Sequence, residues 1–316
     1  MIRVAVLDDY QKAALTCADW SALGEDTEVV VFDDHLADAD SLIARLEDFD
    51  VLVLMRERTP MTVELLMRLP RLRLIVTSGL RNAAIDLAAA AELGIVVSGT
   101  ELDSVPTAEL AWGLVMAVRR NLLGEDAAVR AGRWQVGVPL ELDGSILGVL
   151  GLGNLGARIA RFANAFGMHV LAWSPSLDAA RAVAVGAEAV GFDELFERSD
   201  VVSVHVRFSP ATRGLVGARE LALLGSHGYL VNTSRGPIVD EPALIDALSA
   251  GTIAGAGLDV YDTEPLPADH PLRRTPNTLL SPHMGYVGAR NYRVVYRQAV
   301  EDILAWRAGE PIRILS

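Results

Sequence analysis

Short hydrophobic runs alternate with amphipathic, helix-like stretches over the first hundred residues of the chain. The apolar runs fall at residues 4–7, 29–32, 51–54, 72–76 and 95–97. Runs of this length are typical of buried strands, and their alternation with helical patterns predicts a parallel sheet with helices on both faces. We therefore expect the chain to begin with an α/β domain.

A longer helical pattern follows, and after it a second series of strands and helices. Residues 103–120 predict one helix, with Ser104 as its N-cap and Pro106 and Glu109 in its first turn. Further strands are expected at residues 146–150, 170–173, 201–206, 229–232, 253–258 and 278–280, with a last helix after residue 286. At 316 residues the chain is long for one hydrophobic core, so two domains are expected.

The second series opens on a glycine-rich turn between an apolar strand and a helix. Residues 145–160 read SILGVLGLGNLGARIA, and Gly151, Gly153 and Gly156 form the turn. In this context the first glycine allows a tight turn, the second lets the backbone approach a pyrophosphate, and the third lets the helix pack closely on its strand. The free N–H groups at the helix start then face the anion. A glycine-rich turn often only closes a loop, but the order of strand, turn and helix favours dinucleotide binding.

Composition and charge limit the classes of partner. The chain has 28 Lys and Arg against 41 Asp and Glu, and its formal net charge of −13 argues against nucleic acid or an anionic membrane as a partner. The single cysteine, Cys17, cannot form an internal disulfide, and no apolar run is long enough to span a bilayer. Because the chain opens directly into a predicted strand without a signal peptide, a cytoplasmic enzyme is the expectation.

A second cofactor contact is expected at the end of the strand that follows the glycine turn. An acidic residue about twenty positions beyond the glycines commonly binds the ribose hydroxyls in such domains. Ser174 holds that place here. It can bind a ribose hydroxyl, but it neither repels a 2′-phosphate nor supplies a cation for one. Arg158 and Arg181 could supply the cation, although solvated helix faces are the plainer interpretation, so the pattern favours NAD and leaves NADP open.

Three polar stretches at predicted strand ends carry groups that a hydride-transfer enzyme needs. They occupy residues 232–236, 259–265 and 281–285. Arg235 suits the task of polarising a carbonyl and holding a carboxylate, because its planar fork makes two parallel hydrogen bonds. His283 suits proton donation near neutral pH, and a carboxylate such as Glu264 would fix its tautomer and raise its pKa. Singly they could be a turn brace, a capped loop histidine and a surface carboxylate, but active sites of such sheets collect at this edge.

Other polar residues give weaker signals. Arg56, Arg58 and Arg81 follow predicted strands of the first series, where ligands bind, and the alternative for each is a surface ion pair. His205 is expected inside a strand, packed near the cofactor. No spacing of cysteine, histidine or carboxylates indicates a metal site. Trp134 is interpreted as a packing residue or interface anchor.

The motifs GLGNLG, NTSRG, DVYDTEP and SPHMG, in this order, resemble the D-isomer-specific 2-hydroxyacid dehydrogenase family over nearly the whole chain. The resemblance implies two Rossmann/flavodoxin-like, doubly wound parallel-sheet α/β domains. An NAD(P)-binding domain at residues 100–285 would be inserted into a substrate-binding lid made of residues 1–99 and 286–316. A cleft closing between the domains, and a homodimer formed through the cofactor domains, are also implied.

The same resemblance implies roles for single residues. Arg235 would bind the substrate carboxylate and carbonyl, His283 would be the acid/base, and Glu264 would pair with His283. The backbone amides of Leu80 and Arg81 would bind the substrate carboxylate. The implied cofactor residues are Gly151, Gly153, Asn154, Leu155 and Gly156 at the turn, Ser174, Thr212, Thr233, Asp259 and Gly285.

This chain departs from the family pattern in three places. Ser174 replaces the ribose acid, Arg207 stands where the family commonly has proline, and Arg81 is an addition to the lid loop at residues 78–82. We hypothesise that Arg81, with Arg58, admits a substrate that carries a second anionic group.

Two other functions remain open at this point. The stretch around Arg56 and Arg58 resembles that of phosphoglycerate dehydrogenases. A protein of another class, one that senses NADH on the same fold and recruits partners without catalysis, is the second alternative, although the set of Arg235, Glu264 and His283 argues against it.

Overall fold

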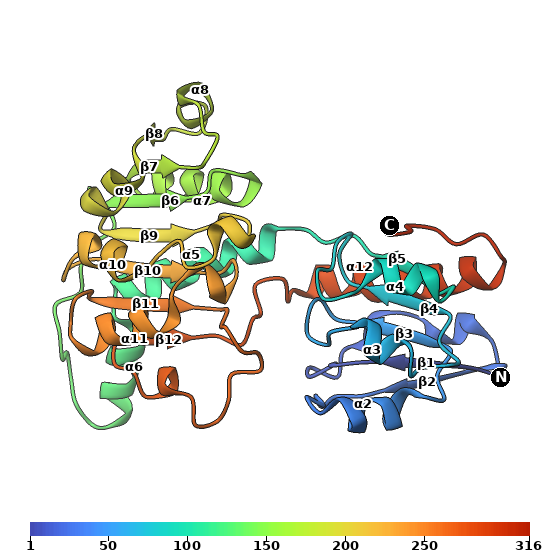
Figure 1. The fold of residues 1–316 in the computed structure, drawn as a ribbon. Helices are drawn as coiled ribbons and strands as arrows, with labels where there is room; N and C mark the ends of the chain where they lie inside the picture. Colours follow the sequence, from blue (N-terminus) through green and yellow to red (C-terminus); the bar gives the residue numbers. More distant parts are fainter. The chain divides into compact units, whose positions relative to one another are not determined.

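The protein consists of two compact units. The computed structural model describes all 316 residues. The first unit comprises Met1–Asp103 and Val287–Ser316, and the second comprises Ser104–Tyr286 (Figure 1). Both are built on parallel sheets with helices against their faces, which is the two-domain α/β architecture that the hydrophobic pattern predicts.

The first unit has a five-stranded parallel sheet in the order β2-β1-β3-β4-β5. This is the flavodoxin-like order, with its switch point between β1 and β3. The strands are β1 (Ile2–Val6), β2 (Thr27–Val31), β3 (Val51–Leu54), β4 (Leu74–Thr77) and β5 (Val96–Gly99). The helices are α1 (Ala14–Cys17), α2 (Ala39–Leu46), α3 (Val63–Leu66), α4 (Leu87–Glu92) and α12 (Ala289–Arg307), with the short 3-10 turn η1 (Trp20–Leu23).

The end of the chain completes this first unit. Helix α12 packs against β4 (Figure 1) and also against α1. The tail then pairs with β5 through an antiparallel bridge between Ser98 and Ile314, where Leu315 N donates to Val97 O at 2.8 Å and Gly99 N donates to Arg313 O at 2.9 Å. The tail thereby satisfies backbone groups of β5, which would otherwise be an open sheet edge.

The second unit has a seven-stranded parallel sheet in the order β12-β11-β10-β9-β6-β7-β8. The strand order reverses between β6 and β9, as in dinucleotide-binding sheets. The strands are β6 (Ile146–Leu150), β7 (His169–Trp173), β8 (Glu188–Ala189), β9 (Val201–Val204), β10 (Tyr229–Asn232), β11 (Gly255–Leu258) and β12 (Thr278–Leu280). The helices are α5 (Val105–Arg119), α6 (Leu122–Arg130), α7 (Asn154–Ala165), α8 (Ala179–Val183), α9 (Phe192–Arg198), α10 (Ala218–Leu224) and α11 (Glu241–Ser249), with the 3-10 turns η2 (Pro210–Thr212), η3 (Gly236–Ile238) and η4 (Pro271–Arg273).

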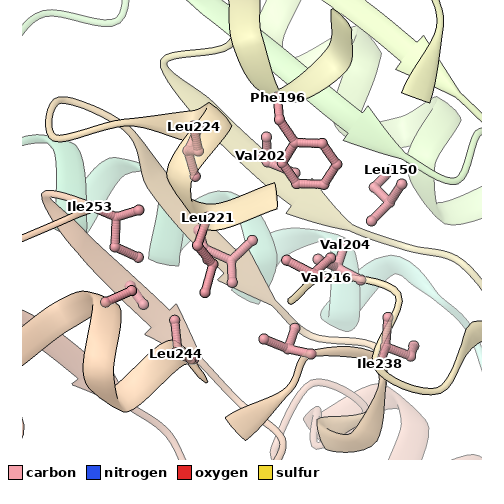
Figure 2. Packing of buried hydrophobic residues seen from close by; sticks show 14 of the residues in the cluster. Leu150, Phe196, Val202, Val204, Val216, Leu221, Leu224, Ile238, Leu244 and Ile253 are labelled. Atoms are coloured by element: carbon pink, nitrogen blue, oxygen red, sulfur yellow. The ribbon is translucent and has the colours of Figure 1, made fainter. Parts of the chain in front are cut away.

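Two hydrophobic clusters cover the two faces of this second sheet. Strand side chains alternate between faces, so Leu147 and Val149 of β6 join α5 and α7 on one face while Leu150 joins the opposite cluster. Figure 2 shows that second cluster, where Phe196 of α9 and Leu221 of α10 pack onto strand residues. Because both faces are buried, the strands read as unbroken apolar runs, which is why the sequence reveals them.

The predicted elements differ from the observed ones in detail. Ser104 lies at the N-cap of α5, but its side chain makes no capping hydrogen bond, and Glu109 lies beyond the first turn. Strand β9 ends at Val204, two residues before the predicted end. The sequence pattern gives no sign of β8, because this edge strand has only two residues, both exposed.

Candidate active site

The glycine turn joins β6 to α7 at the switch point of the second sheet. Gly151 has φ +108°, and a Cβ there would lie 2.5 Å from Val206 N, while a Cβ on Gly156 would lie 2.1 Å from Gly151 O. Only glycine fits either position. A Cβ on Gly153 would meet nothing within 4 Å, so the space in front of this backbone is free for a ligand.

The start of α7 is suited to a phosphate group. Its N-cap is Gly153, which offers no side-chain capping bond, so the first N–H groups of the helix, including those of Asn154 and Leu155, have no intrahelical acceptor. Oriented N–H groups and the helix dipole favour an anion at this point. The turn therefore fits the pyrophosphate of a dinucleotide.

Ser174, immediately after β7, is bonded to the turn itself. Its Oγ accepts a hydrogen bond from Leu152 N at 2.7 Å. Arg181, from α8, donates from Nη2 to Leu152 O at 3.3 Å, so it is not simply a solvated helix residue. Arg158, one turn into α7, makes no ion pair or side-chain hydrogen bond with the turn, whereas Arg181 is bonded to it.

His283 and Glu264 form a close pair on the loops that follow β12 and β11. His283 Nδ1 lies 2.5 Å from Glu264 Oε2, and Glu264 Oε1 accepts from Tyr261 N at 2.9 Å. With Nδ1 held by the carboxylate, Nε2 is the ring atom left to exchange a proton with a substrate. The His283 side chain retains 20% exposure, so a ligand can reach it.

A buried carboxylate holds the loop that carries His283. Asp259, at 1% exposure, accepts from Ser281 Oγ at 2.6 Å and from Met284 N and Gly285 N, each at 2.8 Å. Burial raises the pKa of Asp259, and these hydrogen bonds act against that rise. The family resemblance implies that Asp259 and Gly285 are cofactor residues, but it does not reveal that Gly285 N donates to the Asp259 carboxylate and helps to fix the His283 loop.

Arg235 stands on a loop that is tied to both neighbouring strand ends. Asn232 Nδ2 donates to Arg235 O at 2.9 Å, and Ser234 Oγ donates to Val206 O at 2.6 Å. A Cβ on Gly236 would lie 2.1 Å from the carbonyl carbon of Tyr261, so this loop packs against the loop of Glu264. The Arg235 Nη1 group donates to Ser234 O at 2.7 Å.

Two buried polar atoms at this edge have no hydrogen-bond partner in the protein, namely Thr233 Oγ1 and His205 Nδ1. His205 follows β9 and does not lie inside it, and its Nε2 is 2.8 Å from Ser203 Oγ. Burial of the ring lowers the pKa of His205 to about 3, so the ring is neutral at physiological pH. Buried groups of this kind need a partner, which a bound cofactor amide would supply.

The side chain of Thr212 makes hydrogen bonds within its own loop. Its Oγ1 donates to Arg207 O at 2.9 Å and accepts from Ser209 N at 2.8 Å. Arg207, which stands where the family commonly has proline, is exposed. The structure contains no group of three or more His, Cys, Asp or Glu residues arranged to hold a metal.

The lid loop at residues 78–82 lies in the first unit, at the end of β4. Gly79 has φ +94°. The backbone N–H of Arg56 donates to Ser78 Oγ at 2.8 Å and thereby fixes the loop. Asn82 Nδ2 donates to Arg56 O, also at 2.8 Å. Leu80 is 53% exposed, and the Arg81 side chain is exposed without an ion pair.

The other two lid arginines are held within the first unit. Arg56 lies 3.2 Å from Glu57 Oε1, in line with the ion-pair alternative. Arg58 donates from Nη1 to Asp8 O at 2.6 Å and stacks 4.5 Å above the ring of Tyr10. Arg81 is therefore the one of the three whose charge is turned to solvent.

Comparison with known proteins decides the family. The sequence model for "D-isomer specific 2-hydroxyacid dehydrogenase, NAD binding domain" matches residues 112–285, more than half of the chain. The chain belongs to this family. It is therefore an oxidoreductase that uses NAD and acts on the CH–OH group of a 2-hydroxy acid, as its fold and its homologues show.

Three relatives illustrate the similarity. The glyoxylate reductase of Korarchaeum cryptofilum is 34% identical over 85% of this chain and 83% of its own. The D-3-phosphoglycerate dehydrogenase of Methanocaldococcus jannaschii is 36% identical over 78% of this chain, which spans only 47% of that relative. The crystal structure of phosphoglycerate oxidoreductase from Vibrio cholerae matches with a TM-score of 0.92 at 36% identity, covering 98% of this chain and 100% of that one.

The sequence pattern left several functional contacts unseen. Ser281, Tyr261, Asn232 and Ser234 lie in the polar stretches that the sequence singles out, but the hydrogen bonds by which they tie the loops of the site together leave no pattern in the sequence. None of the helices is both long enough and apolar enough to cross a bilayer.

Proposed function

We propose that the protein reduces a small 2-keto acid to the D-2-hydroxy acid, with Arg235, Glu264 and His283 as its catalytic group. The observation that carries the proposal is the 2.5 Å contact between His283 Nδ1 and Glu264 Oε2 at the edge of the sheet that holds the glycine turn. A carboxylate bound at Nδ1 fixes the orientation of the ring and leaves Nε2 as the atom that exchanges a proton with the substrate oxygen.

The residues divide the chemistry as follows. Arg235 grips the substrate carboxylate and polarises the adjacent carbonyl, because developing negative charge on the oxygen is stabilised by a fixed cation. His283 Nε2 gives its proton to that oxygen during reduction and takes it back during oxidation. NAD, when bound, supplies or accepts the hydride, and its pyrophosphate is held by the N–H groups of Asn154 and Leu155. Thr233 Oγ1 and Asp259 bind at the nicotinamide end.

We assign substrate selection to the first unit and cofactor binding to the second. The backbone amides of Leu80 and Arg81 would bind the substrate carboxylate from the lid loop. The exposed guanidinium of Arg81 supports a substrate with a second anionic group, and the relatives named for phosphoglycerate point the same way.

We infer that the protein is a homodimer formed through its cofactor domains. Apolar side chains are exposed on α6 and the segment after it, with Trp134 at 78% and Val138 at 95% exposure. A cavity of about 490 Å³ lies beneath this segment, lined in part by Leu123, Val138 and Leu140. An exposed apolar surface of this extent is typical of an interface, and a second copy of the chain is the occupant that the family resemblance implies.

Light scattering on the purified chain tests the dimer. We expect twice the chain mass for the wild type, and dissociation when Trp134 and Val138 are both replaced by Asp. Leu15→Asp, at an exposed apolar position of the first unit, is the control and should remain dimeric. A monomeric wild type would refute the proposal.

We also propose a cytoplasmic location, consistent with the free thiol of Cys17, and cell fractionation tests it.

The decisive test of activity is a panel of keto acids. The wild type is mixed with NADH or NADPH and with glyoxylate, hydroxypyruvate, a dicarboxylic keto acid or phosphohydroxypyruvate, and loss of cofactor absorbance is followed. We expect turnover of at least one acid. Tight NADH binding without turnover of any acid would contradict the proposal and favour the NADH-sensing alternative.

A further inference from the structure

The adenosine end of the glycine turn differs from a site built for NAD alone. Strand β7 pairs with β6 in register, so that Trp173 lies beside Leu150, and the residue after Trp173 reaches the turn. In NAD sites this place carries an acid that binds the ribose 2′-hydroxyl. Here it carries Ser174, whose Oγ accepts from Leu152 N at 2.7 Å and keeps its own proton to donate. A serine removes the repulsion that a carboxylate would exert on a 2′-phosphate.

A guanidinium is bonded to the same residue of the turn. Arg181 Nη2 donates to Leu152 O at 3.3 Å, so one end of the guanidinium is held at the turn. A guanidinium has five N–H donors, and this contact uses one of them. The side chain is exposed and has no carboxylate within ion-pair distance, and the nearby Asp178 caps α8 by accepting from Arg181 N at 2.8 Å.

Arg181 differs from many other arginines of this acidic chain, because it is not paired with a carboxylate. The chain has a net charge of −13, and many of its arginines meet a carboxylate of another segment. Examples are Arg45 with Asp34, Arg198 with Glu188 and Arg219 with Asp193. Arg181 instead meets a backbone carbonyl beside the cofactor turn, which leaves a cation available to an anion.

The geometry points to a 2′-phosphate site formed by Ser174 and Arg181, so that this protein binds NADP(H) as well as NAD(H) and prefers the phosphorylated form. Both side chains bond to the backbone of Leu152, between Gly151 and Gly153, Ser174 to its N–H and Arg181 to its carbonyl oxygen. An arginine near the end of the second strand accommodates a 2′-phosphate in dinucleotide-binding sheets, and its planar fork matches the phosphate oxygens. The inference rests on the proposed function, because it requires a dinucleotide at the glycine turn.

The competing explanation is that Arg181 only stabilises the conformation of the glycine turn. A residue with that role would contribute to the stability of the protein and would affect the binding of every adenosine ligand equally. A phosphate-binding residue changes the ratio between a ligand with the 2′-phosphate and one without it. The ratio therefore separates the two roles.

Calorimetric titration of the whole chain with adenosine 2′,5′-bisphosphate and with 5′-AMP measures this ratio without any turnover. We expect the wild type to bind the bisphosphate more tightly by about tenfold or more, the scale of one charge-assisted hydrogen bond. Arg181→Gln should bring the two affinities together, and Ser174→Asp should reverse the preference. Arg161→Gln, at an exposed arginine of α7 that makes no ion pair, is the matched control and should keep the wild-type ratio.

The outcomes separate this inference from the proposed function. Equal affinities of the wild type for the two ligands, or an unchanged ratio in Arg181→Gln, would overturn the 2′-phosphate site while NADH binding and keto acid reduction persist. Failure of the wild type to bind AMP, the bisphosphate, NADH and NADPH would overturn both. A parallel titration with NADH and NADPH, followed by the fluorescence of Trp173 and the other tryptophans, should give the same order of affinities.

Discussion

The carboxyl edges of the two parallel sheets are built differently. In the second unit, the loops after β9, β10, β11 and β12 are bonded to one another, and the buried Asp259 alone receives three hydrogen bonds from the loop of His283. In the first unit, the backbone of the lid loop is also fixed, by Arg56 and Asn82, but the side chains of Leu80 and Arg81 extend into solvent.

This difference separates two tasks. Proton transfer requires groups held within hydrogen-bond reach of the reacting atoms, which a shared network of buried polar contacts provides. Selection among related acids requires only that one or two side chains at the mouth of the site vary, and exposed side chains can change without loss of stability. The proposed function therefore assigns proton transfer to the second unit and substrate selection to the first.

Removing the proton donor should have the largest effect on activity. We expect His283→Ala to lower kcat/KM by about 10³-fold, since a positioned acid/base contributes on this order. Steady-state kinetics on the best keto acid measures this, and the Kd for NADH is the control and should stay close to the wild-type value. A variant with more than a tenth of the wild-type rate would show that the group lies elsewhere.

Breaking the network beneath the donor should have the next largest effect. Asp259→Asn removes the charge and places an NH₂ group among N–H and O–H donors, so we expect the free energy of unfolding to fall by about 2 kcal/mol. Urea denaturation measures it. Ser281→Ala, which removes only one of the three hydrogen bonds, should lose about 1 kcal/mol. Equal losses in the two variants would contradict the clamping role of Asp259.

The lid arginine should affect selectivity more than rate. We expect Arg81→Ala to lower kcat/KM about tenfold for a phosphorylated or dicarboxylic keto acid, because one charge-assisted contact is lost, and to leave glyoxylate reduction nearly unchanged. The comparison uses one enzyme preparation and a panel of acids. Equal losses on all acids would remove the hypothesis of a second anionic group.

The smallest expected effect concerns the tail of the first unit and depends on pH. Asp302 is fully buried and bonds Arg313 at 2.9 Å, and burial raises its pKa to about 7. Because the folded pKa lies above the unfolded one, the protonated form stabilises the fold at low pH, and this contribution is lost as the pH rises towards 7. Asp302→Asn should gain stability relative to the wild type as the pH rises from about 4 to about 7, with a constant difference above that range, measured by thermal melts. Parallel profiles would contradict this.

Strand positions and the chemistry-bearing motifs could be predicted from the sequence because each leaves a local signal. Both faces of the sheets are buried, so the strands are unbroken apolar runs, and the glycine turn has a steric reason for each glycine. The contacts of Asp259 with Ser281 and Gly285 leave no such signal, since they join residues more than twenty positions apart. The contact of Arg181 with Leu152 is hidden for the same reason, because a helix arginine reads as solvated until the loop folds back.

The pairing of Ser98 with Ile314 has a consequence for the order in which the protein acquires its structure during synthesis. The second unit is complete once residue 286 has left the ribosome, so its sheet can assemble while the chain is still growing. The first unit must wait, because α12 and the segment that borders β5 are synthesised after the whole second unit. Until then the side of β4 against which α12 packs lacks its cover, so apolar surface in the first hundred residues stays exposed while the second unit is being made.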